Sequence, residues 1–580
     1  MTEKLSGGEM LIRALQDEGV EYIFGYPGGA SLHIYDALFK QQEVEHILVR
    51  HEQGATHMAD GYARATGKVG VVLVTSGPGA TNAITGLATA YMDSIPMIVI
   101  SGQVPTSVIG TDAFQETDMI GVSRPVVKHS FFINKAEEIP KAVKQAFYIA
   151  SSGRPGPVVI DIPKDATEPT ESYLYEYPDS VSIRSYNPRL EGNTRQVKKA
   201  VSAIKEAKQP IIYSGGGVIQ GNATEELREF AQLTGAPVTN TLMGLGAMHG
   251  EDPQFVGMLG MHGTYEANCA MHYSDLIIAI GARFDDRVTN NPRKFCPHAT
   301  IIHVDIDPAS ISKIVPVEIP IVGDCKLVLQ ELNRLLSANG AGVYPSSDHL
   351  DPWWSKINEW RTKHGLDHDQ RHRQGRDGSL LPQQVVQAIY RKTQGDAFVT
   401  SDVGQHQMFA AQYYRFSKSR QWINSGGLGT MGFGFPAAMG VQFAYPDEIV
   451  VCITGEGSFM MNMQELSTCQ QYRLPIKIVN INNRALGMVK QWQDMQYGGR
   501  LSHSTYTNAL PNFAELIESF GHVGFTAKNL EELDEVVEEA FSDKHRDHLV
   551  FIDAHVDPDE HVYPMSVKGG SLLDMVLVKG

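Results

Sequence analysis

The fold is decided by the stretch Ile449–Asn462, "IVVCITGEGSFMMN", in which an apolar run stops at a carboxylate held between two glycines. The run is rich in β-branched residues and has no polar alternation, which favours a strand buried on both faces. The segment after Glu456 predicts the start of a helix. Because ligands bind beyond the carboxyl ends of strands in doubly wound sheets, we expect Glu456 to have a functional role.

The same plan recurs along the chain. Short apolar, β-rich runs end in Gly, Asp, Asn or Ser in "GVVLVTSGPG", "PMIVISGQ", "PVVIDIPKD", "PIIYSGGG", "LIIAIGARFDD", "IIHVDIDP" and "IKIVNINN". Amphipathic helical stretches such as "PKAVKQAFYIA" and "LEELDEVVEEAF" lie between these runs. Strands that are apolar on both faces need helices on each side, so we predict an α/β protein built from doubly wound parallel sheets.

Two polar stretches with Pro, Gly or Tyr, around residues 166–193 and 337–379, are interpreted as linkers. They divide the 580 residues into three predicted domains, 1–175, 190–340 and 370–580, since a chain of this length is too long for one core. The first and third domains are candidates for distant relatives of each other.

Composition restricts the class of partner. The formal charge of −17 argues against a nucleic-acid or anionic-membrane surface, because binding there depends on basic residues. The five cysteines are scattered and never in CxxC spacing, which is typical of buried thiols in a reducing cytosol. The N-terminal residues resemble neither a signal peptide nor a transit sequence, and no apolar run approaches the roughly 18 residues of a membrane span. We therefore expect a cytoplasmic protein that binds neither nucleic acid nor membrane.

A carboxylate and an amide stand at the ends of two predicted strands. Glu456 follows one of them, and Asn483 closes "IKIVNINN". If these strands are neighbours in the sheet, the two side chains meet, and their hard oxygens suit Mg²⁺ with a phosphate as a further ligand. A GxG sequence by itself is more often only a strand-to-helix turn, but the paired asparagines at this spacing favour the metal site.

The stretch "GEGSFMMNMQEL…LPIKIVNINN" resembles the signature of thiamine-diphosphate enzymes, a GDG followed by two asparagines. The resemblance implies that Glu456 and Asn483 bind Mg²⁺ together with the backbone carbonyl of Ala485, and that Gly457 and Ser458 contact the coenzyme. Glu456 stands where most members of the family carry Asp. Glutamate has the same charge and a longer reach, so we expect Mg²⁺ binding to survive with altered affinity.

The first domain holds the predicted activating acid. "LVRHEQGATHMADGYARATGK" resembles the family element whose glutamate activates the aminopyrimidine of the coenzyme, which implies that role for Glu52. A glutamate at a helix start is more commonly a dipole-favoured cap. The neighbouring matches "FGYPGGASLHIYDAL", which includes Gly29, and "TSGPGATNAITGLATAYMDSIP" favour the catalytic interpretation. The resemblance also implies a homodimer or tetramer with active sites at the subunit interface.

Further matches extend the predicted coenzyme contacts. "SDVGQHQMFAAQYY" resembles the wall around the diphosphate and pyrimidine, and "SGGLGTMGFGFPAAMG" the stretch under the bent coenzyme. The implied contacts are Gly404, Gln405, His406, Gly429 and Met431. A methionine is more often core filler, but its place in the matched stretch favours the coenzyme role.

The middle domain resembles an FAD-binding domain through "SGGGV", "LGMHG", "GARFDDRVT", "HVDIDP" and "GDC". The implied FAD contacts are Gly215, Gly216, His262, Gly263, Arg283, Asp305, Asp324 and, from "SGRPGP", Arg154. Glycines admit close approach of the backbone to a pyrophosphate, Arg283 can pair with it, and Asp305 can bond adenosine hydroxyls. Each glycine run by itself is weak and is usually a turn. By resemblance the FAD is structural, without a redox role.

Taken together, these stretches resemble the catalytic subunits of the biosynthetic acetohydroxyacid (acetolactate) synthases over nearly the whole chain. The resemblance implies decarboxylation of pyruvate and its joining to a second 2-ketoacid, either pyruvate or 2-ketobutyrate. Met488 and Trp492 match the substrate pocket, where Trp492 would favour 2-ketobutyrate by about 1–3 kcal/mol. Phe114 and Gln115 match residues near the reacting centre, and Lys164 matches one at the substrate entrance.

Three other functions are weighed against this one, and a further protein subunit is implied. Glyoxylate carboligases share the FAD domain but lack the activating glutamate, which this chain has at Glu52. Pyruvate oxidases would use the flavin for redox chemistry. A non-catalytic coenzyme-binding scaffold is conceivable because of Glu456. The resemblance also implies a small regulatory subunit that confers valine inhibition.

Overall fold

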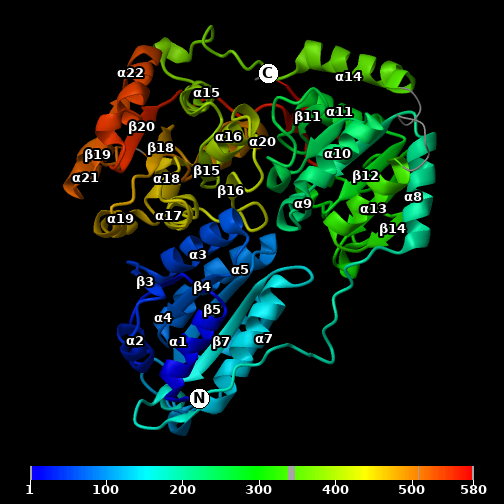
Figure 1. The fold of residues 1–580 in the computed structure, drawn as a ribbon. Helices are drawn as coiled ribbons and strands as arrows, with labels where there is room; N and C mark the ends of the chain where they lie inside the picture. Colours follow the sequence, from blue (N-terminus) through cyan, green and yellow to red (C-terminus); the bar gives the residue numbers. More distant parts are fainter. Residues whose placement is uncertain (1–2, 338–346, 507, 578–580) are drawn as a thin grey trace.

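The computed structural model contains three parallel six-stranded sheets, and it describes residues 3–337, 347–506 and 508–577 (Figure 1). The first sheet has the order β3-β2-β4-β5-β7-β6. Its strands are β2 (Tyr22–Gly25), β3 (Glu45–Leu48), β4 (Gly70–Val74), β5 (Met97–Gln103), β6 (His129–Phe132) and β7 (Pro157–Pro163). Its helices are α1 (Gly7–Asp17), α2 (Leu32–Phe39), α3 (Glu52–Thr66), α4 (Pro78–Asn82), α5 (Ile84–Asp93), α6 (Met119–Ser123) and α7 (Ile139–Ser151). Helices α1, α2 and α7 enclose one core, and α3 and α5 another on the opposite face.

The third sheet has the order β16-β15-β17-β18-β20-β19. Its strands are β15 (Phe398–Ser401), β16 (Trp422–Asn424), β17 (Val450–Thr454), β18 (Lys477–Asn482), β19 (Val523–Ala527) and β20 (Val550–His555). Its helices are α15 (Pro382–Thr393), α16 (Gln405–Tyr413), α17 (Gly434–Ala444), α18 (Glu456–Phe459), α19 (Leu466–Tyr472), α20 (Gly487–Gln496), α21 (Phe513–Ser519) and α22 (Leu530–Ala540). When the strands are numbered within each domain, the first and third sheets have the same order, so the two domains share one topology.

The central sheet has the order β11-β10-β9-β12-β13-β14, which is the strand order of dinucleotide-binding domains. Its strands are β9 (Pro210–Ser214), β10 (Val238–Asn240), β11 (Phe255–Met258), β12 (Leu276–Ile280), β13 (Thr300–Asp305) and β14 (Ile319–Val322). Its helices are α8 (Thr194–Glu206), α9 (Gly216–Gln220), α10 (Thr224–Thr234), α11 (Tyr265–Tyr273), α12 (Asp286–Thr289) and α13 (Cys325–Ser337). Helix α14 (Asp351–His364) packs on this domain, where the indole of Trp353 donates to the carbonyl of Pro210 at 3.0 Å.

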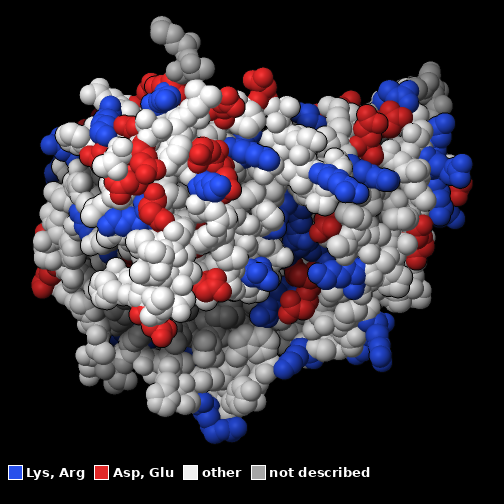
Figure 2. Space-filling model, turned by 90° about the horizontal axis from the view of Figure 1, so that it is seen from below, with Lys and Arg blue, Asp and Glu red and all other residues white. Residues whose placement is uncertain are grey.

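Two short antiparallel pairs complete the fold. β1 (Lys4–Leu5) pairs with β8 (Tyr173–Leu174), and β21 (Met565–Ser566) pairs with β22 (Met575–Val576) near the C-terminus. None of the described helices is both long enough and apolar enough to cross a membrane. All five cysteines are buried and free. On the face seen in Figure 2, Lys and Arg lie beside Asp and Glu.

Helices α3 and α17 join the first and third domains, and they lie next to each other in Figure 1. Their contact depends on glycine. A Cβ at Gly61 would lie 2.2 Å from the carbonyl oxygen of Ala437, and a Cβ at Gly440 would lie 1.9 Å from that of Met58. One buried core therefore runs from the first sheet through both helices to the third sheet. Since α3 begins at Glu52, this packing also positions the predicted activating acid.

Candidate functional site

A cavity of about 90 Å³ lies where the third sheet reverses its strand order, between β15 and β17. Such a reversal is where doubly wound sheets bind ligands. Loops that follow β15, β17 and β18 form most of the wall. The predicted site residues in the wall are Gly404, Gln405, His406, Met431, Glu456, Gly457, Ser458, Asn483, Ala485 and Met488.

Glu456 and Asn483 converge at this cavity. They follow the neighbouring strands β17 and β18, in which Thr454 pairs with Asn480. Glu456 Oε1 accepts a hydrogen bond from the N–H of Ala485 at 2.7 Å, and Asn483 Oδ1 accepts from the same N–H at 3.1 Å. A carboxylate oxygen and an amide oxygen therefore meet at one backbone position, as a hard cation such as Mg²⁺ requires.

Burial controls the protonation of Glu456. The side chain is 1% exposed, and burial raises the pKa of its carboxyl to about 7. Hydrogen bonds from the backbone N–H groups of Ala485 and Asn483 lower that pKa in part. A cation bound here would favour the carboxylate form.

Neighbouring side chains leave no room for a Cβ at the two glycines that flank Glu456. A Cβ at Gly455 would lie 2.8 Å from Nδ1 of His406, and one at Gly457 would lie 2.5 Å from the hydroxyl of Tyr506. The GEG sequence therefore lets two polar side chains approach the strand end. The sequence did not predict this contact of Tyr506 with Gly457.

His406 offers a polar atom to the cavity. Its Nε2 finds no hydrogen-bond partner among the residues that the structure describes, although the side chain is buried. Burial lowers the pKa of His406 to about 4, so the ring is neutral at physiological pH. Gly429 lies on the loop before Met431 with φ of 73°, a left-handed conformation that favours glycine.

Glu52 is at the start of α3, after the N-cap residue His51. It is 9% exposed, and its Oε2 accepts a hydrogen bond from Nδ2 of Asn82 at 3.0 Å. The cavity in the third domain is lined by residues between 382 and 489 alone. Within one chain, therefore, the structure does not bring Glu52 or the exposed Gly29 to this cavity.

Glu465 anchors the start of α3 and was not assigned a role from the sequence. It is fully buried, and its two carboxylate oxygens accept from the backbone N–H of Arg50 at 3.0 and 3.1 Å. A Cβ at Gly54 would lie 2.6 Å from its Oε1. A residue of the third domain thus binds the segment that carries Glu52.

The predicted substrate residues lie apart from the cavity, except for Met488. Phe114 is 88% exposed, and Gln115 has φ of 59° on a loop packed against Gly77. Lys164 is half-buried, and its carbonyl is within hydrogen-bond distance of His33 Nδ1 at 3.2 Å. Trp492 is half-buried one helical turn after Met488 on α20, outside the cavity wall.

The predicted FAD residues gather at the carboxyl ends of the central strands. Gly215, Gly216, Arg283, Asp305 and Asp324 follow or end β9, β12, β13 and β14, which are neighbours in the sheet. A Cβ at Gly215 would lie 2.2 Å from the carbonyl oxygen of Gly281, so β9 and the end of β12 approach closely there. His262 and Gly263 follow β11 at the other end of the sheet order.

Charged groups from two domains meet at this edge. Arg154 Nη1 lies 3.3 Å from Asp307 Oδ2, and Arg283 Nη1 donates to the carbonyl of Met92 at 2.9 Å. Burial raises the pKa of Asp305 to about 6, while the N–H of Asp307 donates to its Oδ1 at 2.8 Å. Two guanidinium groups and a buried carboxyl are suited to a pyrophosphate and a ribose hydroxyl, respectively.

Comparison with known proteins gives matches along the chain. Models of thiamine pyrophosphate enzymes match as the N-terminal TPP binding domain over residues 5–122, the central domain over 197–332 and the C-terminal TPP binding domain over 402–554. The chain is 60% identical to the acetolactate synthase large subunit of Haemophilus influenzae over 577 residues, which are 100% of this chain and 99% of that protein. With the same coverage it is 56% identical to the acetolactate synthase isozyme 3 large subunit of Escherichia coli K12. It is 45% identical to the acetolactate synthase of Mycobacterium bovis over 581 residues, 100% of this chain and 92% of that protein.

Proposed function

The chain belongs to the acetolactate synthase large subunits, whose three domains are those of thiamine-diphosphate enzymes, and from this premise we propose that it joins two 2-ketoacids. Pyruvate is decarboxylated, and its remaining two carbons are transferred to a second pyruvate or to 2-ketobutyrate. The products are 2-acetolactate and 2-aceto-2-hydroxybutyrate, precursors of the branched-chain amino acids. The convergence of Glu456 and Asn483 on the N–H of Ala485 is the observation that supports this activity best.

The cavity residues fit a metal-bound diphosphate. Glu456, Asn483 and the carbonyl of Ala485 would hold Mg²⁺, since these are hard oxygen donors. Ser458 and Nε2 of His406, which has no hydrogen-bond partner among the described residues, would bind phosphate oxygens beside the metal. When bound, thiamine diphosphate supplies an electron sink for decarboxylation and a carbon nucleophile for the joining step.

Glu52 would hold the proton shared with the pyrimidine ring of the coenzyme. Because the cavity of one chain does not include Glu52, a second copy would have to supply it, which favours a homodimer, or a tetramer of two such dimers. Phe114, Gln115 and Lys164 would reach the substrate from that second copy. Trp492 would favour 2-ketobutyrate by packing on its extra methyl group.

The central domain would bind FAD in a structural role. Its strand order is that of dinucleotide-binding domains, and Arg154, Arg283 and Asp305 lie at the edge where such ligands bind. The names of the relatives as large subunits support a small regulatory subunit as partner. We further propose that the enzyme acts in the cytoplasm.

The test is acetolactate formation from pyruvate by the purified protein with thiamine diphosphate, Mg²⁺ and FAD. We expect Glu52→Gln to lower the rate by about 10²–10⁴-fold, the usual contribution of a positioned acid or base. The exposed Glu518→Gln serves as a matched control and leaves the rate unchanged. Pyruvate consumption that requires oxygen or a quinone, or a Glu52→Gln variant with full activity, would contradict the assignment.

A further inference from the structure

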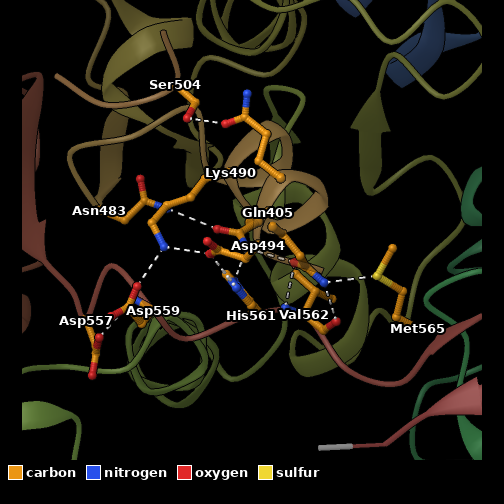
Figure 3. Close-up of polar contacts among 12 residues, drawn as sticks. Gln405, Asn483, Lys490, Asp494, Ser504, Asp557, Asp559, His561, Val562 and Met565 are labelled. Carbon is orange, nitrogen blue, oxygen red and sulfur yellow. Dashed lines mark hydrogen bonds and ion pairs between the residues drawn. The ribbon is translucent and has the colours of Figure 1, made fainter. Parts of the chain in front are cut away.

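A chain of side-chain amides runs from Asn483 to the C-terminal segment, in the region drawn in Figure 3. Asn483 Nδ2 donates to Gln405 Oε1 at 3.0 Å, and Gln405 Nε2 donates to Gln491 Oε1 at 2.8 Å. Gln491 then forms two hydrogen bonds with the backbone of Val562, one in each direction and each of 3.0 Å. Gln405 and Gln491 are 5% and 0% exposed, so water does not compete for these bonds.

The backbone of Val562 fixes the direction of every bond in this chain. A backbone N–H only donates and a carbonyl only accepts, so the oxygen of Gln491 must face the N–H of Val562. That oxygen also accepts a hydrogen bond from Nε2 of Gln405. Oε1, at the other end of the Gln405 amide, therefore faces Asn483. The nitrogen of Asn483 therefore faces Gln405, and its oxygen faces Ala485 and the position proposed for the cation.

His561 adds a second, longer contact at the same end of Gln405. Its Nε2 lies 3.0 Å from Oδ2 of Asp494, and a carboxylate only accepts, so we assign the ring proton to Nε2. Nδ1 is then an acceptor, and it lies 3.4 Å from Nε2 of Gln405. Two acceptors, Gln491 Oε1 and His561 Nδ1, thus select the nitrogen end of Gln405.

Ion pairs hold the C-terminal segment on helix α20. The ammonium of Lys490, whose side chain is 7% exposed, lies 2.8 Å from Asp494 Oδ2 and 2.6 Å from Asp559 Oδ1 (Figure 3). Asp559 is also paired with Arg376. Segment 557–562 is therefore attached to α20 by side chains as well as by the backbone of Val562.

Glycine at position 487 leaves room for the bond that ends the chain of amides. A Cβ at Gly487 would lie 2.2 Å from Oε1 of Gln405 and 2.4 Å from Nδ2 of Asn483. Any side chain at this position would separate the two amides. The start of α20 is thus shaped around the hydrogen bond between them.

We propose that Gln491 is a positioning residue which, through Gln405, keeps the side-chain oxygen of Asn483 turned toward Mg²⁺. The proposal rests on the metal site of the proposed function. Without Gln491, only the longer contact of 3.4 Å with Nδ1 of His561 opposes a turn of the Gln405 amide. Once turned, its nitrogen faces Asn483 and attracts the oxygen of that amide. The NH₂ group of Asn483 then faces the cation, which it cannot bind.

The first experiment is a calorimetric titration of Mg²⁺ into the full-length protein at saturating thiamine diphosphate. Gln491→Met removes the amide at nearly constant volume, and we expect the Kd for Mg²⁺ to rise by about 10–100-fold, as for residues that orient metal ligands. Gln387→Met is the matched control, because Gln387 is a buried amide of α15 that bonds backbone groups of His368 and Gln370. We expect this control to leave the Kd unchanged.

Two further variants separate orientation from loss of structure. Gln491→Glu keeps an oxygen facing Gln405, so we expect it to retain the affinity that Gln491→Met loses. In the background Asn483→Asp both side-chain ends are oxygen, so adding Gln491→Met should cost no further affinity. An unchanged Kd for Gln491→Met, or an equal loss in both backgrounds, would overturn the proposal.

Failure of the proposed metal site gives a different result. If the parent protein binds no Mg²⁺, or if Asn483→Ala leaves its Kd unchanged, the metal assignment is wrong and the positioning role of Gln491 is wrong with it. If Asn483→Ala weakens Mg²⁺ binding while Gln491→Met does not, the metal site stands and only the role of Gln491 is refuted.

Discussion

Replacing Glu465 by glutamine is expected to change how the stability of the protein depends on pH. The carboxylate is fully buried between the domains, where it accepts from the N–H of Arg50 at 3.0 and 3.1 Å and from Oγ1 of Thr468 at 2.7 Å. Glutamine has nearly the same shape but does not ionise. The substitution therefore isolates the effect of a buried charge at the start of α3.

The magnitude follows from the pKa of this group. Burial raises the pKa of Glu465 from 4.5 to about 7, and the hydrogen bonds from Thr468 and Arg50 only partly oppose this. The folded protein thus holds the proton more tightly than the unfolded chain. The stability that this proton contributes is fully present below pH 4.5 and is lost as the pH rises through about 7. At about 1.36 kcal/mol per pKa unit, the loss between pH 5 and pH 8 is about 2.5 kcal/mol.

The assay is thermal unfolding of the coenzyme-free protein at several pH values between about 5 and 8. For a domain of this size, about 2.5 kcal/mol corresponds to a shift in Tm of about 5–10 °C. We expect the Tm of Glu465→Gln minus that of the parent protein to rise by this amount from pH 5 to pH 8. Glu518→Gln, at an exposed position, should show no such trend. A difference that stays constant or falls with pH would refute the reasoning, since it would mean that the buried carboxylate is stable as a charge.

Two more substitutions test the contacts between the first and third domains. Gly440→Ala would place a methyl group 1.9 Å from the carbonyl oxygen of Met58, so we expect a loss of about 3 kcal/mol by thermal unfolding, and an unchanged Tm would contradict the helix contact. Asp93 pairs with Arg64 at 2.9 Å and accepts a hydrogen bond from the N–H of Gly427 at 2.8 Å. We expect Asp93→Asn to lower the free energy of unfolding by about 3–5 kcal/mol. We also expect it to weaken the binding of thiamine diphosphate, which a titration would measure. Normal coenzyme affinity in a destabilised Asp93→Asn protein would show that the contact serves stability alone.

The strands and the polar residues that end them are predictable from the sequence. Composition on both faces of a strand is a local property, so runs such as the one before Glu456 indicate buried parallel strands. The polar residue after such a run lies at the ligand-binding edge by the geometry of the fold. Glu456 and Asn483 follow two neighbouring strands of one sheet and meet at Ala485.

Other site residues have no local signature. Glu465 and Asp93 lie in stretches that match the family, but each accepts hydrogen bonds from backbone N–H groups more than 300 positions away. Every residue except proline carries such a donor, so sequence patterns do not distinguish the N–H of Arg50 or Gly427 from any other. The role of Gln491 also has no local signature in the sequence, because it depends on the backbone of Val562.

The sequence by itself therefore determined the strand plan, the three α/β domains and the side chains at the strand ends, because these depend on periodicity and composition within short windows. Only the tertiary structure decided which distant segments meet. In the tertiary structure α3 packs on α17 through glycines, and Glu465 contacts the start of α3. Glu52 does not line the cavity of its own chain. Such contacts are set by shape and by backbone donors and acceptors in three dimensions, and the order of residues along the chain does not encode them locally.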